Sequence, residues 1–266
     1  MSMAGSASVP SYQTLALTRA GRVLTIAFNR PEVLNAVNLV MHDELAEVFA
    51  FAGSDAHSDI IVLTGAGQAF SAGGDLEHLA RNAARPELFD HEVTVARRIV
   101  LAMLEIDKPL ICRLNGHAVG LGATLALLSD VIFAADSAKI GDPHVNVGLV
   151  AGDGGAVVWP LRIGFARAKE FLLTGELLKA DKARDLGLVN HCMPLAELDA
   201  AVEACCKRLL RLSPQAVRGT KQLLNIELKR IVGSVLDTGL ALEAASVRSP
   251  EHRAAVDAMR AKLAGK

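Results

Sequence analysis

Short apolar runs alternate with stretches of helical apolar spacing along the first two thirds of the chain. Apolar and β-branched residues fill the runs that predict buried strands: 22–29 (RVLTIAFN), 59–66 (DIIVLTGA), 109–116 (PLICRLNG) and 131–136 (VIFAAD). The spacing of apolar residues predicts helices over 39–52, 88–106 and 121–130. Strand–loop–helix repetition of this kind indicates an α/β core.

The last third of the chain has a different pattern. After Phe165, long helical patterns continue to Lys266, with interruptions at Gly187, Pro194, Pro214 and Pro250. The sequence therefore predicts a mobile N-terminal tail at residues 1–11, an α/β core at 12–195 and a helical C-terminal extension at 196–266. The apolar helical faces from 200 to 263 exceed what the core can cover, so we expect subunits to associate.

Composition and charge narrow the class of protein. The chain has 266 residues and a formal net charge of −1, which gives no overall basic field to attract nucleic acid or an anionic membrane. No apolar run approaches the ~18 residues of a membrane span. The first residues, MSMAGSASVP, lack the features of a secretory signal, and the cysteines show no CxxC spacing. We expect a cytoplasmic protein with no nucleic-acid or membrane partner.

Two glycine-rich loops each follow a predicted strand and precede a predicted helix. They are residues 64–76 (TGAGQAFSAGGDL) and 115–128 (NGHAVGLGATLALL). Neither contains the lysine of a phosphate loop, and the GxGxxG pattern is absent from both. Such loops are either tight turns or places where backbone N–H groups meet a ligand. Amides at the start of a helix can stabilise negative charge that develops on a carbonyl oxygen.

Several segments in order resemble the enoyl-CoA hydratase/isomerase (crotonase) superfamily. They are LTIAFNRPEVLNAVN, VLTGAGQAFSAGGDL, NGHAVGLGATLALLSDVIFAADSAKIG, GLVAGDGG and LLTGELLKADKARDLGLVNHCMP. The resemblance implies an α/β core built as a spiral of ββα repeats, with a helical C-terminal region that forms a homo-trimer or a hexamer. It also implies an acyl-CoA thioester substrate, with CoA as part of the substrate and with no separate cofactor or metal. The thioester carbonyl would lie between the backbone amides of Gly74 and Leu121, as an oxyanion hole.

The resemblance also implies a set of residues that contact the substrate. The segments around residues 32–36 and 72–76 would follow the CoA moiety, while the second glycine loop would border the acyl pocket. The predicted binding residues are Val33, Leu34, Ala36, Ala72, Gly73, Asp75, Leu76, His117, Gly120 and Thr124. For His117, a role in packing the loop is an equally good interpretation.

The chain departs from the family at the acid–base positions. Hydratases of the family use two glutamates, because hydration needs water held at Cβ and a proton delivered to Cα. Thr124 and His144 stand at these positions, and a threonine hydroxyl is a poor proton donor or acceptor near pH 7. We predict that His144 carries the proton transfer instead. Asp153 or Glu243 would orient the imidazole and stabilise its charged form.

The trio of His144, Asp153 and Glu243 resembles one branch of the superfamily in particular. That branch, which includes 6-oxocamphor hydrolase, cleaves cyclic β-diketones by retro-Claisen chemistry, and the run GDGGAVVWP at 152–160 is similar to its GDG…VVWP run. Three hypotheses follow: a hydratase or isomerase of acyl-CoA thioesters, a C–C bond hydrolase of β-diketones, or a non-catalytic member that binds acyl-CoA. We expect the first, with the other two as alternatives.

Overall fold

The computed structural model describes residues 8–264, and residues 1–7 of the predicted tail lie outside the described residues. Its main sheet has the strand order β1-β2-β3-β4-β6-β9. β1 is antiparallel to β2, and the other neighbours are parallel. The strands are β1 (Leu15–Ala20), β2 (Val23–Phe28), β3 (Ile60–Gly65), β4 (Leu110–Leu114), β6 (Val131–Ala135) and β9 (His191–Met193). The predicted strands are therefore confirmed, while β1 and β9 were not predicted.

A second, smaller sheet lies beside the glycine loops. It joins β5 (Ala118–Val119), β7 (Lys139–Gly141) and β8 (Leu178–Lys179), with β5 parallel to β7 and β7 antiparallel to β8. β5 is part of the second glycine loop, and its backbone also pairs with the first loop through a bridge between Ser71 and Ala118. The two glycine loops are therefore held against each other.

Helices surround the sheets, and the predicted helices are confirmed. The core carries α1 (Leu39–Ser54), α2 (Leu76–Ala84), α3 (Phe89–Glu105), α4 (Leu121–Leu127), α5 (Gly155–Ile163), α6 (Phe165–Thr174) and α7 (Ala180–Leu186). The C-terminal region is α8 (Leu195–Leu210), α9 (Pro214–Val247) and α10 (Pro250–Ala264). In the described part of the chain, no helix is both long enough and apolar enough to cross a membrane. An α/β fold with a helical C-terminal region is thus confirmed.

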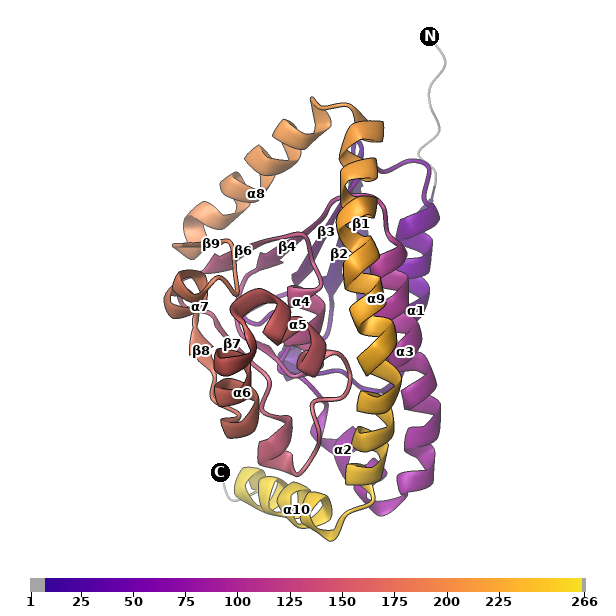
Figure 1. The fold of residues 1–266 in the computed structure, drawn as a ribbon, viewed down its shortest axis with the longest axis vertical. Helices are drawn as coiled ribbons and strands as arrows, with labels where there is room; N and C mark the ends of the chain where they lie inside the picture. Colours follow the sequence, from indigo (N-terminus) through magenta and orange to yellow (C-terminus); the bar gives the residue numbers. More distant parts are fainter. Residues whose placement is uncertain (1–7, 265–266) are drawn as a thin grey trace.

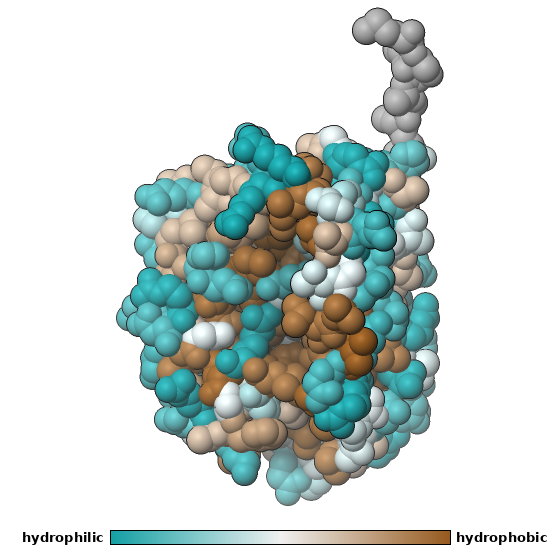
Figure 2. Space-filling model, turned by 45° about the horizontal axis from the view of Figure 1, so that its top comes forward, coloured by the Kyte–Doolittle hydropathy of each residue, from teal (hydrophilic) through white to brown (hydrophobic). Residues whose placement is uncertain are grey.

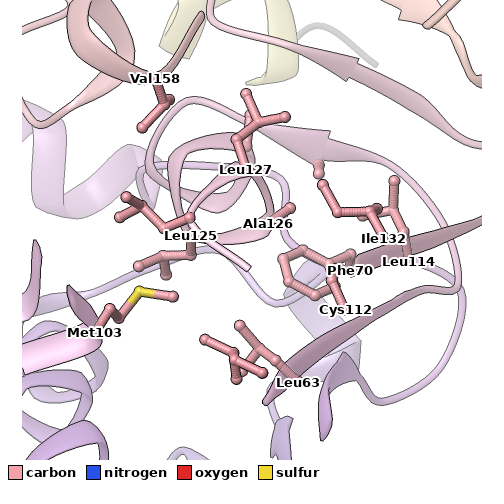
Figure 3. Packing of buried hydrophobic residues seen from close by; sticks show 14 of the residues in the cluster. Leu63, Phe70, Met103, Cys112, Leu114, Leu125, Ala126, Leu127, Ile132 and Val158 are labelled. Atoms are coloured by element: carbon pink, nitrogen blue, oxygen red, sulfur yellow. The ribbon is translucent and has the colours of Figure 1, made fainter. Parts of the chain in front are cut away.

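Helix α4 is buried on all sides in the core. Every residue from Leu121 to Leu127 is buried, so this helix has no solvent-facing side. Figure 3 shows Leu125, Ala126 and Leu127 among side chains from the sheet and from α3 and α5. A helix packed on all sides loses contacts if it shifts, because protein interiors are close-packed. The core therefore fixes the N-terminal end of α4, where the second glycine loop ends.

The long helix α9 returns the chain to the core. Figure 1 shows α9 running beside α3, with α10 lying across the end of the molecule near α2. Gly152 and Gly239 allow the closest approach, because a Cβ on Gly152 would overlap the carbonyl group of Gly239. The same Cβ would lie 2.9 Å from the Cβ of Glu243. This contact sets where α9 meets the loop before α5.

Apolar side chains remain exposed on the helical surface. Figure 2 shows hydrophobic residues gathered in the hollowed middle of one face, with hydrophilic residues around them. Leu223 and Leu224 of α9 are 71% and 72% exposed, and Phe165 and Leu173 of α6 are each 73% exposed. Apolar surface gathered on one face, as in Figure 2, is typical of a contact between subunits.

The Gly152–Gly239 contact gives a test of packing. Gly152→Ala should lower the free energy of unfolding by about 1–3 kcal/mol, because overpacking at a backbone contact forces the loop and α9 apart. The matched control is Gly233→Ala in α9, where an added Cβ would meet open space. It should raise stability by roughly 0.5–1 kcal/mol. Urea denaturation at fixed protein concentration measures both, and equal effects of the two variants would contradict the packing argument.

Association of subunits is the second expectation. Leu223 and Leu224 should be covered in a homo-trimer or a hexamer, as their exposure suggests. Light scattering at micromolar concentration measures the mass, and the double variant Leu223→Lys/Leu224→Lys should shift it toward the monomer. A wild-type protein that is monomeric under these conditions would show the expectation to be wrong.

Candidate active site

A cavity of about 230 Å³ lies between the two glycine loops, helices α1 to α3 and the C-terminal helices. Both predicted amide donors, Gly74 and Leu121, line it, and so do His144, Asp153 and Glu243. Of the predicted binding residues, Ala72, Gly73 and Gly120 also line it. The structure therefore brings the predicted catalytic residues together from segments that are far apart in sequence.

The amides of Gly74 and Leu121 are left without partners by the local backbone geometry. Val37 donates its N–H to the carbonyl of Gly73 (2.7 Å) and accepts from the amide of Asp75 (2.9 Å), so the N–H of Gly74 faces away from Val37. In the second loop, Gly120 has φ 55°, and α4 begins directly after it. Within residues 8–264, neither amide has a hydrogen-bond acceptor. Two donors beside one cavity are thus available to a ligand oxygen.

His144 stands at the start of a short 3₁₀ helix, η3 (His144–Val147), and is held by a buried carboxylate. Its Nδ1 makes a short hydrogen bond with Asp142, whose side chain is fully buried. A Cβ on Gly155 would overlap Oδ2 of Asp142, so only glycine fits at that position of the GDGG run. The carboxylate fixes the ring and determines which nitrogen faces the cavity.

The other ring nitrogen, Nε2, lies between two more carboxyl groups. It is 3.8 Å from Oδ2 of Asp153 and 3.9 Å from Oε1 of Glu243. These separations exceed a direct hydrogen bond and are suited to a bridging water. The ring also adjoins the second glycine loop, because a Cβ on Gly120 would lie 3.9 Å from Nε2 of His144.

Burial and charge shift the protonation of these groups together. Burial alone would lower the pKa of His144, but the nearby Asp142, Asp153 and Glu243 carboxylates raise it well above its ordinary value. Burial raises the pKa of Asp153. Burial, and then the charge of Asp153, raise the pKa of Glu243 well above its ordinary value. Because the groups interact strongly, the imidazole and the carboxyl groups exchange protons as one unit. Perturbed groups of this kind are typical of active sites.

Thr124 and His117 lie outside the cavity lining. The hydroxyl of Thr124 donates to Oδ1 of Asp153 (3.3 Å), so it supports a cavity residue from behind. Nδ1 of His117 accepts from the amide of Lys139 (3.1 Å), and its carbonyl accepts from the amides of Phe70 and Ser71. His117 therefore has the loop-packing contacts that were its alternative interpretation.

The remaining predicted binding residues lie outside the cavity as well. These are Val33, Leu34, Ala36, Asp75 and Leu76. Val33 and Leu34 are exposed, and the carbonyl of Leu34 accepts from the amide of Ala72 (3.0 Å), a cavity residue. Asp75 is the N-cap of α2 and pairs with Arg30 at 3.0 Å, so its side chain has a structural role.

Sequence reasoning missed two features of the site. Asp142 precedes His144 by two residues in GDPH, a spacing that suits an Asx turn and by itself indicates no catalytic pair. On the wall formed by α1 to α3, the cavity is lined by a second group of polar residues: His42, His78, Asn82 and Glu92. No sequence signal separates these residues from the polar positions of solvent-facing helices.

One group of side chains has the composition of a metal site. Ligand atoms of Asp142, His144 and Asp153 lie within 4.8 Å of one another. Asp142 approaches Nδ1 of the imidazole, whereas Asp153 lies near Nε2. The two carboxylates thus flank the ring on different nitrogens and are poorly placed to share one ion with it. The absence of a metal remains a prediction, which a comparison of turnover before and after dialysis against a chelator would test.

The sheet order, the paired glycine loops and the C-terminal helices define a crotonase-type α/β protein. Residues 18–260 match the family model described as enoyl-CoA hydratase/isomerase, so the chain belongs to that family. It is 33% identical over 230 residues to 2,3-dehydroadipyl-CoA hydratase of Escherichia coli strain K12, with 86% of this chain and 87% of the relative covered. Membership of a family of hydratases and isomerases supports the prediction that this protein is an enzyme.

Solved structures agree with the crotonase fold. An enoyl-CoA hydratase/isomerase from Mycobacterium paratuberculosis superposes with a TM-score of 0.90 at 40% identity, covering 94% of this chain and 100% of that chain. A β-diketone hydrolase from the cyanobacterium Anabaena sp. PCC 7120, bound to (S)-3-oxocyclohexyl acetic acid, gives 0.82 at 28% identity, covering 93% and 96%. The predicted spiral fold is confirmed, and the β-diketone hydrolase branch is represented among the neighbours.

The charge of Asp142 gives a pH prediction. If neutral His144 is the base, kcat/KM should rise with pH through a limb above about 6.5, since the carboxylates raise the pKa of His144. Asp142→Asn removes one of the negative charges that raise the pKa of His144, so the rise of kcat/KM should move to lower pH. The maximal rate should fall by roughly 10²-fold, because the imidazole ring is no longer held in its orientation. The control is Asp185→Asn, an exposed carboxylate paired with Arg184. A limb that moves to higher pH in Asp142→Asn would exclude His144 as the titrating base.

Proposed function

We propose that the protein hydrolyses a C–C bond between two carbonyl groups, by retro-Claisen chemistry. The observation that carries this proposal is the position of Nε2 of His144. This nitrogen is 3.8 Å from a carboxyl oxygen of Asp153 and 3.9 Å from one of Glu243. It also lies beside the second glycine loop, and the backbone amides of Gly74 and Leu121 are unpaired. A water between these groups would be activated by an oriented base and would attack one ketone, while the second carbonyl of the substrate is bound at the amides.

The reaction divides into two proton transfers. Nε2 of His144 takes a proton from the water, and the water oxygen adds to the ketone carbon. The bond between that carbon and the central carbon then breaks, and its electron pair forms an enolate on the second carbonyl. The amides of Gly74 and Leu121 hold the enolate oxygen, each donor being typically worth about 3 kcal/mol. The proton on His144 returns to the central carbon, which gives a carboxylic acid and a ketone.

The buried carboxyl groups would stabilise the charges that form during this reaction. Asp142 stabilises the imidazolium that forms after the first proton transfer, as the raised pKa of His144 indicates. Asp153 and Glu243, whose pKa values are raised mainly by burial, would hold the attacking water by hydrogen bonds. The similarity to a β-diketone hydrolase supports the proposal, as does a cavity of about 230 Å³, which suits a compact substrate.

Hydration or isomerisation of an acyl-CoA thioester is the second candidate. The relatives favour it, and so does the exposed Leu34, whose backbone is bonded to the cavity residue Ala72. A long pantetheine chain would enter past these residues, and the amides of Gly74 and Leu121 would hold the thioester oxygen. His144 with Asp153 or Glu243 would then move the proton at Cα, since Thr124 lies outside the cavity lining.

Replacing His144 tests its role as the base, and the choice of substrate separates the two candidates. His144→Ala should lower kcat by roughly 10²–10⁴-fold for a cyclic β-diketone, the usual size of a general acid–base contribution. Thr124→Val is the matched control, since it keeps the side-chain volume and removes only the hydrogen bond to Asp153; its effect should be far smaller. Turnover is measured with 2-methylcyclohexane-1,3-dione and with crotonyl-CoA.

The two substrates give opposite outcomes under the two candidates. Cleavage of the diketone with little hydration of crotonyl-CoA supports the C–C hydrolase. Rapid hydration of crotonyl-CoA that survives His144→Ala would show both the base and the reaction to be wrong. Binding of CoA thioesters in a thermal-shift titration, without turnover of either substrate, would instead indicate a non-catalytic member.

A further inference from the structure

We infer that the wall of the cavity formed by α1 to α3 is a subsite for a neutral oxygen of the substrate, a hydroxyl or a ketone remote from the reacting carbonyl. The subsite consists of His42, His78, Asn82 and Glu92, here called the far polar cluster. The inference rests on the proposed function, because it names the class of substrate that the same cavity takes.

Glu92 holds the far polar cluster together. It is buried, and its Oε2 bonds to Nε2 of His78 (2.7 Å), while its Oε1 accepts from Nδ2 of Asn82 (2.9 Å). Arg81 reaches Oε1 from the rim at 3.3 Å. Both carboxylate oxygens are therefore engaged and the charge is balanced locally. The cluster is built in advance of any ligand, which is the condition for a specific polar subsite.

His42 is the member that lacks a partner. Its residue is 7% exposed and lines the cavity, and its Nδ1 is buried without a hydrogen-bond partner among residues 8–264. Burial lowers the pKa of His42 to about 4, so the ring is neutral near pH 7 and offers one donor and one acceptor. Buried polar groups are rarely left unpaired, because their desolvation is unfavourable. A hydroxyl or carbonyl oxygen of a ligand supplies the missing partner.

The charge around the cavity selects a neutral oxygen over a carboxylate. Asp142, Asp153 and Glu243 line or support the opposite wall, and the charge of Glu92 is close enough to raise the pKa of Glu243. A ligand carboxylate in the far polar cluster would face these acidic groups in a space with little water. A hydroxyl or ketone meets no such repulsion.

The test uses ketones that the proposed reaction cannot cleave. Cyclohexanone and 4-hydroxycyclohexanone contain no 1,3-dicarbonyl, so their binding is independent of retro-Claisen turnover. Isothermal titration calorimetry measures Kd for both, with the wild-type protein and with His144→Ala. The hydroxylated ketone should bind roughly 10-fold more tightly to both proteins, the effect of one buried hydrogen bond.

Two variants of the far polar cluster and one control complete the design. His42→Phe and His78→Phe should reduce the preference to about onefold while retaining cyclohexanone binding. His91→Phe, an exposed histidine of α3 that pairs with Asp43, should keep the preference. Thermal denaturation confirms folding, and if one cluster variant does not fold, the other still decides. If His42 and His78 had only a structural role, their variants would weaken the binding of both ketones equally.

Several results would overturn the inference. Equal binding of the two ketones to the wild type would mean that an ordered water, not a ligand, satisfies His42. A preference that survives in the folded cluster variants would place the hydroxyl elsewhere. Failure of the proposed C–C hydrolysis alone leaves these binding results intact, so the two proposals fail separately.

Discussion

The contact between Asp142 and His144 is the constraint around which the rest of the site is arranged. A fully buried carboxylate is tolerated only when it is paired, because removal of an ion from water is strongly unfavourable. The imidazole supplies that pairing through Nδ1, which leaves Nε2 toward the cavity. Any residue larger than glycine at 155 would collide with Asp142, so α5 must begin with glycine. The position of the Asp142 carboxylate therefore restricts residue 155 to glycine by steric exclusion.

The same pair depends on the C-terminal helices. Glu243 reaches the site because α9 packs against the loop before α5 at Gly152 and Gly239, and Met259 of α10 closes part of the lining. The sequence predicts a boundary between a core ending at 195 and an extension from 196, and α8 begins at Leu195. In the structure, however, the extension contributes a carboxyl group and part of the cavity wall. The helical region is therefore part of the site itself.

Sequence reasoning succeeded where the signal was local and repeated. Strands β2, β3, β4 and β6 follow from short apolar runs and the larger helices from periodic apolar residues, and the two glycine loops indicated amides beside a cavity. It failed for β5 and β8, since strands of two residues have no period to detect. Asp142, His42 and Glu92 were missed for another reason. Charged and polar residues are usually exposed, and only long-range packing determines that these are buried.

The cavity combines two different polar clusters with apolar lining residues, and this difference would orient a substrate. Near the glycine loops, paired charges and unpaired amides suit a reacting carbonyl, whereas the far polar cluster around Glu92 is balanced in charge. Leu79, Phe89 and Leu149 add apolar side chains to the cavity lining. Exclusion of water there strengthens each electrostatic interaction at the reacting end. A substrate with oxygens at both ends satisfies both polar walls in one orientation, so its binding energy positions the reacting carbonyl at His144.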